Sequence, residues 1–181
     1  HLSIRRQRQM CIRDRYKDIM DMLKDKGVQI VVDATSRLLT NVLEYNPFFI
    51  KPNQHELGDI FNVTLNTQEE VIPYALKLKK MGAVNVCVSM GGKGAILVAD
   101  DGNVYKAKAP DGILKNSVGA GDSLVAGFLS GWIEKKDYEY AFRKGVATGS
   151  ASAFSERLAT VGEVNMLIDK VAVSYTHLRA H

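Results

Sequence analysis

A chain of 181 residues, 46% hydrophobic and 24% charged, is long enough for one globular domain with a buried core, and its composition excludes a disordered or fibrous protein. Apolar runs such as residues 84–90 are broken by glycine and lysine well before the about 20 residues that a membrane-spanning helix needs. The formal charge of +4 gathers at the ends: residues 1–15 hold five arginines against one aspartate and Arg179 adds a further positive charge, which leaves −1 for residues 16–173. A nearly neutral body argues against a nucleic-acid-binding face.

The two ends differ abruptly in composition from the rest of the chain. Residues 1–15 and 174–181 show no apolar periodicity of the kind that packs as helix or strand, so we predict foreign or disordered arms around a domain at 16–173. No apolar stretch of signal-peptide length follows the basic N-terminus, and the chain has only two cysteines, Cys11 and Cys87. These features predict a cytoplasmic protein without a disulfide framework or a cysteine metal site.

In chain order, helical and strand-like segments alternate, as in a layered α/β domain. The first half predicts a helix over 16–26, a strand over 28–32, a short helix over 38–45, a buried strand over 47–50 and a helix starting at 53. Ile19, Met22 and Leu23 share one face of the first helix, which ends at Gly27. Thr67 is expected to cap a helix through residue 81, and residues 84–89 form a third strand, apolar on both faces as in a parallel sheet.

The second half begins with a predicted hairpin. Strands over 95–99 and 104–108 are joined by Asp-Asp-Gly-Asn, a turn sequence, which adds antiparallel strands on this side of the sheet. Three helices follow, over 120–135, 138–154 and 163–171. The predicted fold is a three-layer α/β/α domain with a mostly parallel sheet.

The strongest chemical signal is Gly119-Ala120-Gly121-Asp122 directly before an apolar helix. Small residues at a helix start let the backbone amides of Gly119, Ala120 and Gly121 approach an anion closely, and the helix dipole favours negative charge there. Asp122, in the same first turn, is placed to orient a hydroxyl and take its proton. Taken alone, the four residues also fit an ordinary glycine-rich turn before a helix.

The wider segment Asn116 to Ser123 resembles the C-terminal signature of PfkB-family (ribokinase-like) carbohydrate kinases, and its Asn-Ser-Val start is similar to the 1-phosphofructokinase branch. The resemblance covers roughly residues 16–171 and implies a ribokinase-like fold. It also implies that Asp122 is the catalytic base and that Gly119, Ala120 and Gly121 form the anion hole.

Two further segments agree with this family in the same order. Lys51-Pro52-Asn53-Gln54-His55-Glu56 resembles its Asn-x-x-Glu element, in which Asn53 approaches the ATP phosphates and Glu56 holds Mg²⁺. The segment Ser89-Met90-Gly91-Gly92-Lys93-Gly94 resembles the turn that lines the ATP site, which implies nucleotide contacts from Ser89, Gly91, Gly92, Lys93 and Gly94. Each also has a plainer interpretation: Asn53 and Glu56 fit a helix-capping pair, and 91–94 fits a simple turn between strands. His55 is expected to be solvated and Cys87 to lie in the core.

The activity implied by the resemblance is transfer of the ATP γ-phosphoryl group to the C6 hydroxyl of fructose 1-phosphate, with Mg²⁺ near Asn53 and Glu56. Relative to the family, we expect the N-terminal sugar-binding half and the lid to be missing, so this chain alone should bind nucleotide weakly and turn over little substrate. Tagatose-6-phosphate kinase and a non-catalytic nucleotide-binding module stay open as alternatives. The resemblance further implies a homodimer for the full-length protein, without nucleic-acid or membrane partners.

Overall fold

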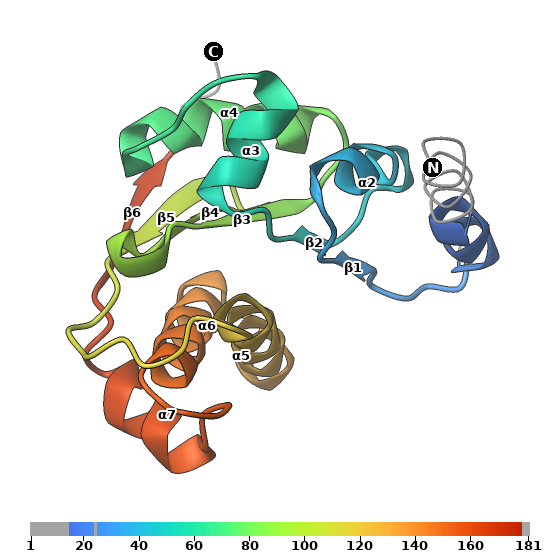
Figure 1. Ribbon diagram of the computed structural model, residues 1–181. Coiled ribbons are helices and arrows are strands. Elements are labelled where there is room, and N and C mark those ends of the chain that lie inside the picture. The colour runs from blue at the N-terminus through green and yellow to red at the C-terminus, as the bar shows by residue number, and fades with distance from the viewer. Residues whose placement is uncertain (1–14, 24, 179–181) are drawn as a thin grey trace, which may run out of the picture.

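The computed structural model describes residues 15–23 and 25–178, in which a six-stranded sheet lies between two layers of helices (Figure 1). The strands occur in the sheet in the order of the chain: β1 Val31–Val32, β2 Phe49–Ile50, β3 Asn85–Ser89, β4 Ala95–Val98, β5 Asn103–Ala107 and β6 Val173–His177. This layered arrangement confirms the predicted α/β/α class.

The helices divide between the two faces of the sheet. One face is covered by α2 (Ser36–Thr40), α3 (Gln54–Phe61) and α4 (Gln68–Lys80), and the other by α5 (Ala120–Lys135), α6 (Tyr138–Ala153) and α7 (Val161–Ile168) (Figure 1). Thr67 caps α4 as predicted, by accepting the Glu70 amide, and α5 has the predicted bounds.

The sheet is mixed rather than mostly parallel. The pairs β1–β2 and β2–β3 are parallel, whereas β3–β4, β4–β5 and β5–β6 are antiparallel. Short connections explain the first two antiparallel pairs, because the 3₁₀ turn Gly91–Lys93 and the Asp100–Gly102 turn are too short to cross the sheet and can only reverse the chain. The predicted β4–β5 hairpin is confirmed.

Two hydrophobic cores lie on the two faces of the sheet, and strand side chains alternate between them. On β3, Val86 and Val88 join the core under α2, α3 and α4, whereas Cys87 joins the core under α5, α6 and α7. Burial therefore accounts for the continuous apolar run of this strand. Burial also raises the pKa of the Cys87 thiol to about 12, so the predicted core role of Cys87 is confirmed.

The first helical segment presents a different face from the predicted one. Residues 15–23 are helical, but Ile19 and Met22 are 54% and 73% exposed, whereas Met20 is buried. Tyr16, one turn before Met20, packs against the same core. The packed face of this helix is therefore the one that carries Tyr16 and Met20, an i, i+4 pair.

Other boundaries shift by a few residues. The predicted helix over 38–45 divides into α2 and a 3₁₀ turn at Leu43–Tyr45, and the strands at 28–32 and 47–50 shorten to β1 and β2. The last helix begins at Val161, two residues early, because Thr160 and Glu163 form a capping box. Among the described helices, none combines the length and apolar character needed to cross a membrane.

The C-terminal arm was predicted not to pack as a strand, and for residues 174–177 that is wrong. Residues Val173–His177 form β6, paired antiparallel with all of β5. Main-chain hydrogen bonds need no apolar period, and most β6 side chains are exposed, so the pairing left no signal in the side-chain pattern. The other predicted arm lies outside the described residues except for Arg15, which is helical.

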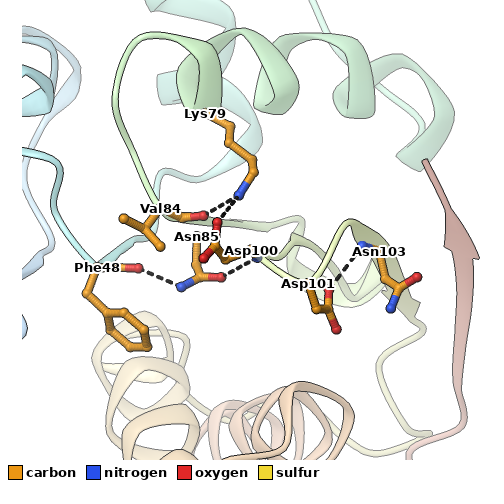
Figure 2. Close-up of polar contacts among 7 residues, drawn as sticks. All are labelled: Phe48, Lys79, Val84, Asn85, Asp100, Asp101 and Asn103. Atoms are coloured by element: carbon orange, nitrogen blue, oxygen red, sulfur yellow. Dashed lines mark hydrogen bonds and ion pairs between the residues drawn. The ribbon is translucent and has the colours of Figure 1, made fainter. Parts of the chain in front are cut away.

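A buried amide connects β2, β3 and the β4–β5 turn (Figure 2). Asn85 is fully buried, its Nδ2 donates to the Phe48 carbonyl at 2.8 Å, and its Oδ1 accepts the Asp100 amide at 2.9 Å. Above it, Lys79 Nζ donates to the Val84 carbonyl and pairs with the Asp100 carboxylate at 3.1 Å. Asn85 therefore links three segments of the sheet that are distant in sequence.

Replacing Asn85 by alanine is expected to lower the free energy of unfolding by about 1–3 kcal/mol, because the Asp100 amide loses its acceptor inside the protein. Chemical denaturation measures the difference. Asn165 is exposed on α7, so Asn165→Ala serves as the control and should change stability by less than about 0.5 kcal/mol. Equal stabilities of the two variants would mean that water satisfies the groups that Asn85 now pairs.

Candidate active site

The candidate site lies at the carboxyl ends of the three parallel strands. Asp33 directly follows β1, Lys51 directly follows β2, and Ser89 ends β3. Parallel strands place these ends at one edge of the sheet, where open α/β proteins bind their ligands. Asn53 forms a bridge with Ser89, whose amide donates to the Pro52 carbonyl at 3.2 Å.

The start of α5 lies against this edge. Gly119, the residue before the helix, has φ +78°, a conformation that glycine adopts without strain. A Cβ added to Gly121 would lie 3.0 Å from Lys51 Nζ, so the Gly-Ala-Gly turn and the lysine ammonium are in direct proximity. The structure thus brings the predicted anion cradle next to a cation that sequence reasoning did not assign to the site.

The cradle differs in one detail from the prediction. The Ala120 amide donates to the Ser117 carbonyl at 3.3 Å, a long hydrogen bond, while the Ser123 amide makes the first regular helical bond to Gly119 at 2.9 Å. The Ala120 amide is therefore partly engaged within the turn and is not fully available to an anion. Asp122 is exposed in this first turn, so its carboxylate is accessible to a substrate.

Lys51 and Asp33 form a partly buried ion pair within the site. Lys51 is only 7% exposed, and its Nζ lies 3.4 Å from Asp33 Oδ2. Burial raises the pKa of the Asp33 carboxyl; Lys51 opposes that rise, and the nearby carboxylates of Asp122 and Glu56 add to it. Lys51 thus pairs with Asp33, and the carboxylates of Asp122 and Glu56 lie within electrostatic reach of that pair.

Asn53 and Glu56 adopt the capping geometry that was their plainer interpretation. Asn53 Oδ1 accepts the amides of His55 and Glu56, each at 2.9 Å, and Glu56 Oε2 accepts the Asn53 amide at 2.9 Å. His55 is exposed, as expected. The capping box holds Glu56 in a fixed orientation and occupies one of its two carboxylate oxygens.

The donor set fits Mg²⁺ in kind. Mg²⁺ binds through one or two carboxylates and keeps several waters, and Glu56 and Asp33 interact electrostatically at this edge. No group of three metal-ligating side chains occurs among residues 15–23 and 25–178.

The turn after β3 is less closely connected to the cradle. Lys93 Nζ donates to the Asn66 carbonyl at 2.8 Å, so its ammonium is directed to the α3–α4 connection. Gly94 is buried with φ +90°, and a Cβ there would lie 2.0 Å from the Ala107 carbonyl oxygen. The backbone at this position therefore requires glycine for structural reasons. Gly91 and Gly92 are exposed with open space beside them. Nucleotide contacts from Ser89, Gly91, Gly92, Lys93 and Gly94 therefore stay predictions.

Sequence reasoning missed Asp33 and Lys51 as site residues. Asp33, which follows the predicted strand over 28–32, was given no role, and Lys51 appeared only as the first residue of the segment Lys51 to Glu56. A polar residue directly after a buried strand was the available signal, since each strand end reaches the ligand-binding edge. Their pairing across 18 positions is a tertiary contact that no local pattern contains.

The predicted anion cradle at the start of α5 lies beside a buried lysine, at the carboxyl ends of parallel strands, an arrangement typical of phosphate-binding α/β domains. The whole of this edge lies within residues 11–163, which match the model of the pfkB family carbohydrate kinases. The chain belongs to the pfkB family.

Individual relatives agree with this membership. The chain is 45% identical over 161 residues to 1-phosphofructokinase of Bacillus subtilis and 30% identical over 155 residues to tagatose-6-phosphate kinase of Staphylococcus epidermidis. These alignments cover 89% and 84% of this chain but 53% and 49% of those proteins, so the chain spans about half the length of the curated relatives it matches.

Solved structures confirm the expected ribokinase-like fold. Ribokinase of Arabidopsis thaliana, complexed with ribose and ATP, superposes with a TM-score of 0.69 at 22% identity over 83% of this chain and 50% of that chain. Phosphofructokinase-2 of Escherichia coli, determined in complex with substrates and products, superposes with a TM-score of 0.79 at 28% identity. The superposition covers 87% of this chain and 52% of that chain.

Proposed function

We propose that this chain carries the ATP-binding and catalytic part of a 1-phosphofructokinase, which converts fructose 1-phosphate and ATP to fructose 1,6-bisphosphate and ADP. The observation that carries the proposal is the position of Asp122 in the first turn of α5, beside the cradle glycines and within electrostatic reach of Asp33, which pairs with Lys51. The greater identity to 1-phosphofructokinase, 45% against 30%, favours it over tagatose-6-phosphate kinase.

Each group would have one task in an in-line transfer. Asp122 accepts the proton of the C6 hydroxyl while the hydroxyl oxygen forms a bond to the γ-phosphorus. The bond between the γ-phosphorus and the β,γ-bridging oxygen breaks, which releases ADP. The Gly119 and Gly121 amides and the Lys51 ammonium offset negative charge on the phosphates. Glu56, with Asp33, would hold a hydrated Mg²⁺, which supplies charge neutralisation between phosphates when it is bound.

Two alternative functions differ from this proposal, one in the sugar phosphate that is the acceptor and the other in the class of protein. Tagatose 6-phosphate would be the acceptor if the sugar-contacting residues of the complete protein select it, and a nucleotide-binding module would keep the cradle without transfer. ATP and sugar phosphates are intracellular metabolites, so the proposed enzyme works in the cytoplasm, and the family resemblance favours a homodimer for the full-length protein.

Phosphoryl transfer from Mg-ATP to fructose 1-phosphate and to tagatose 6-phosphate tests the function. The assay uses the gene recovered from its source DNA with an uninterrupted reading frame across both ends of this chain. Transfer to fructose 1-phosphate at the higher kcat/KM supports the proposal. ATP binding without transfer to either sugar favours the nucleotide-binding module and refutes the proposed reaction.

Glu56→Gln separates the capping role of this residue from a metal role. The glutamine amide oxygen can still accept the Asn53 amide, so stability should change by less than about 1 kcal/mol, but the negative charge is lost. The Mg²⁺ concentration for half-maximal nucleotide binding is expected to rise about tenfold, measured by calorimetry at several Mg²⁺ concentrations. An unchanged Mg²⁺ requirement would leave Glu56 with a capping role only.

A further inference from the structure

The contact between the first turn of α5 and the end of α6 contains a buried pair of hydroxyl groups. Ser152 Oγ donates to Ser123 Oγ at 2.8 Å and accepts the Ala159 amide at 3.1 Å. Ser152 is 3% exposed and Ser123 is 8% exposed. The Ser152 hydroxyl therefore links three segments: α5, α6 and the connection that leads to α7.

Ser123 follows Asp122 directly, and its own amide closes the first helical hydrogen bond to Gly119. Holding Ser123 in place therefore holds the backbone of both the candidate base and the cradle. The α6–α7 connection contacts the same turn, because Leu158 Cδ2 lies 3.0 Å from where a Gly119 Cβ would be.

Beside the serine pair, the contact between α5 and α6 is close and is made by backbone and small residues. At its other end, Tyr140 and Lys144 of α6 donate to the Glu134 carboxylate of α5. A Cβ added to Gly149 would lie 2.9 Å from the Ala120 carbonyl, and one added to Gly145 would lie 2.9 Å from the Leu124 carbonyl, so the backbones of α5 and α6 nearly touch. Dispersion contacts of this kind tolerate small sliding or rotation, whereas a hydrogen bond depends steeply on distance and angle.

The serine pair is a directional side-chain contact between α5 and α6 beside the cradle. The neighbouring Ala153 carbonyl accepts the Lys115 and Asn116 amides at 2.9 and 3.1 Å and so holds the segment before the cradle, but not the first turn of α5 itself.

The connection that supplies the Ala159 amide is itself anchored. Ser155 Oγ donates to Glu163 Oε1 at 2.9 Å, and the other Glu163 oxygen accepts the Thr160 amide at 2.7 Å in the capping box of α7. A series of polar contacts thus runs from the start of α7 through the connection and Ser152 to Ser123, beside Asp122.

We propose that Ser152, through Ser123, is a positioning residue for the anion cradle and Asp122. The proposal rests on the proposed function for its catalytic meaning, because phosphoryl transfer needs donors and base held to within about 0.5 Å. A misplacement of about 1 Å can lower a rate about a hundredfold. A merely structural role for the pair would affect stability without altering the cradle itself.

The test uses Ser152→Ala in this chain, with Ser123→Ala as a second variant that removes the same hydrogen bond from the other side. The first readout is amide hydrogen exchange by NMR at Ser123, with the Leu129 amide, two turns along α5, as the internal reference. Local loosening of the cradle should speed exchange at Ser123 about tenfold relative to Leu129, and should shift the Gly119 and Gly121 amide resonances. Equal acceleration at both sites, with unshifted glycines, would overturn the proposal.

The second readout is the Kd for Mg-ATP, expected to rise about fivefold in both serine variants. Val146→Ala is the matched control, because it removes buried volume from α6 and no described contact joins Val146 to Ser123. It should lower the melting temperature without changing the Kd or the cradle resonances. Ser123→Thr retains a hydroxyl and should preserve the wild-type exchange ratio. If the wild-type chain binds no Mg-ATP, the result counts against the proposed function. The ratio of amide exchange at Ser123 to that at Leu129 still decides whether Ser152 positions the cradle.

Discussion

Asp122→Asn is expected to lower kcat for phosphoryl transfer to fructose 1-phosphate by about 10²–10⁴-fold, the usual contribution of general acid–base catalysis. Asparagine has nearly the shape of aspartate but cannot accept the hydroxyl proton. Because Asp122 is exposed and no ion pair holds it in the described structure, the fold should tolerate the change. The loss of a carboxylate near a helix start costs at most about 1 kcal/mol.

The assay compares wild type and variant from the uninterrupted gene at saturating Mg-ATP, with melting temperatures measured alongside. Asp59→Asn, an exposed carboxylate on α3, controls for the loss of one negative charge and should keep full activity. A variant that retains more than a tenth of the wild-type kcat would remove Asp122 from the role of base. Asp33 would then be the next carboxylate to replace, since its raised pKa makes it a better proton acceptor than an ordinary aspartate.

Local patterns predicted the elements whose burial is regular. The continuous apolar run before Ser89 predicted β3, and the apolar period after Asp122 predicted α5, because a buried strand and an amphipathic helix leave different spacings. The incorrect predictions concern features that tertiary contacts decide. β6 is held by main-chain pairing with β5, and the face of the first helix depends on a core contributed by α2, α3 and α4.

The candidate site divides in the same way. Gly119 to Asp122 were found because small residues, an acid and a helix start are contiguous in the chain. The Asp33–Lys51 pair was not found, since it exists only when β1 and β2 lie side by side in parallel. The family resemblance of residues 89–94 implies a nucleotide contact from Lys93, which stays a prediction; in the structure the Lys93 ammonium donates to the Asn66 carbonyl. A local motif thus predicts which functional groups one segment carries. Which of these groups lie together in a site depends on the tertiary contacts.

Lys51→Met is the variant expected to affect both stability and nucleotide binding. Methionine keeps the buried apolar stem but removes the ammonium that pairs with Asp33 and lies beside Gly121. Breaking a fully buried ion pair costs about 3–5 kcal/mol, and because the Asp33 side chain is 33% exposed we expect about 1–3 kcal/mol here. The Kd for Mg-ATP should rise at least tenfold, since the proposed phosphate site loses the ammonium that lies beside Gly121.

The double variant Asp33→Asn/Lys51→Met separates the two effects. Without the carboxylate there is no unpaired buried charge, so the double variant should regain most of the lost stability, measured by chemical denaturation at pH 7. The Kd of the double variant for Mg-ATP should stay raised, because the double variant also lacks the ammonium that is proposed to offset the negative charge of the phosphates. The difference in free energy of unfolding between Lys51→Met and wild type should also depend on pH. Because Lys51 lowers the Asp33 pKa, that pKa rises further in Lys51→Met. The difference should therefore become smaller as the pH falls and Asp33 takes up its proton. If the double variant recovers nucleotide affinity together with stability, Lys51 serves the fold alone, and the cradle must bind phosphate through the amides at the start of α5.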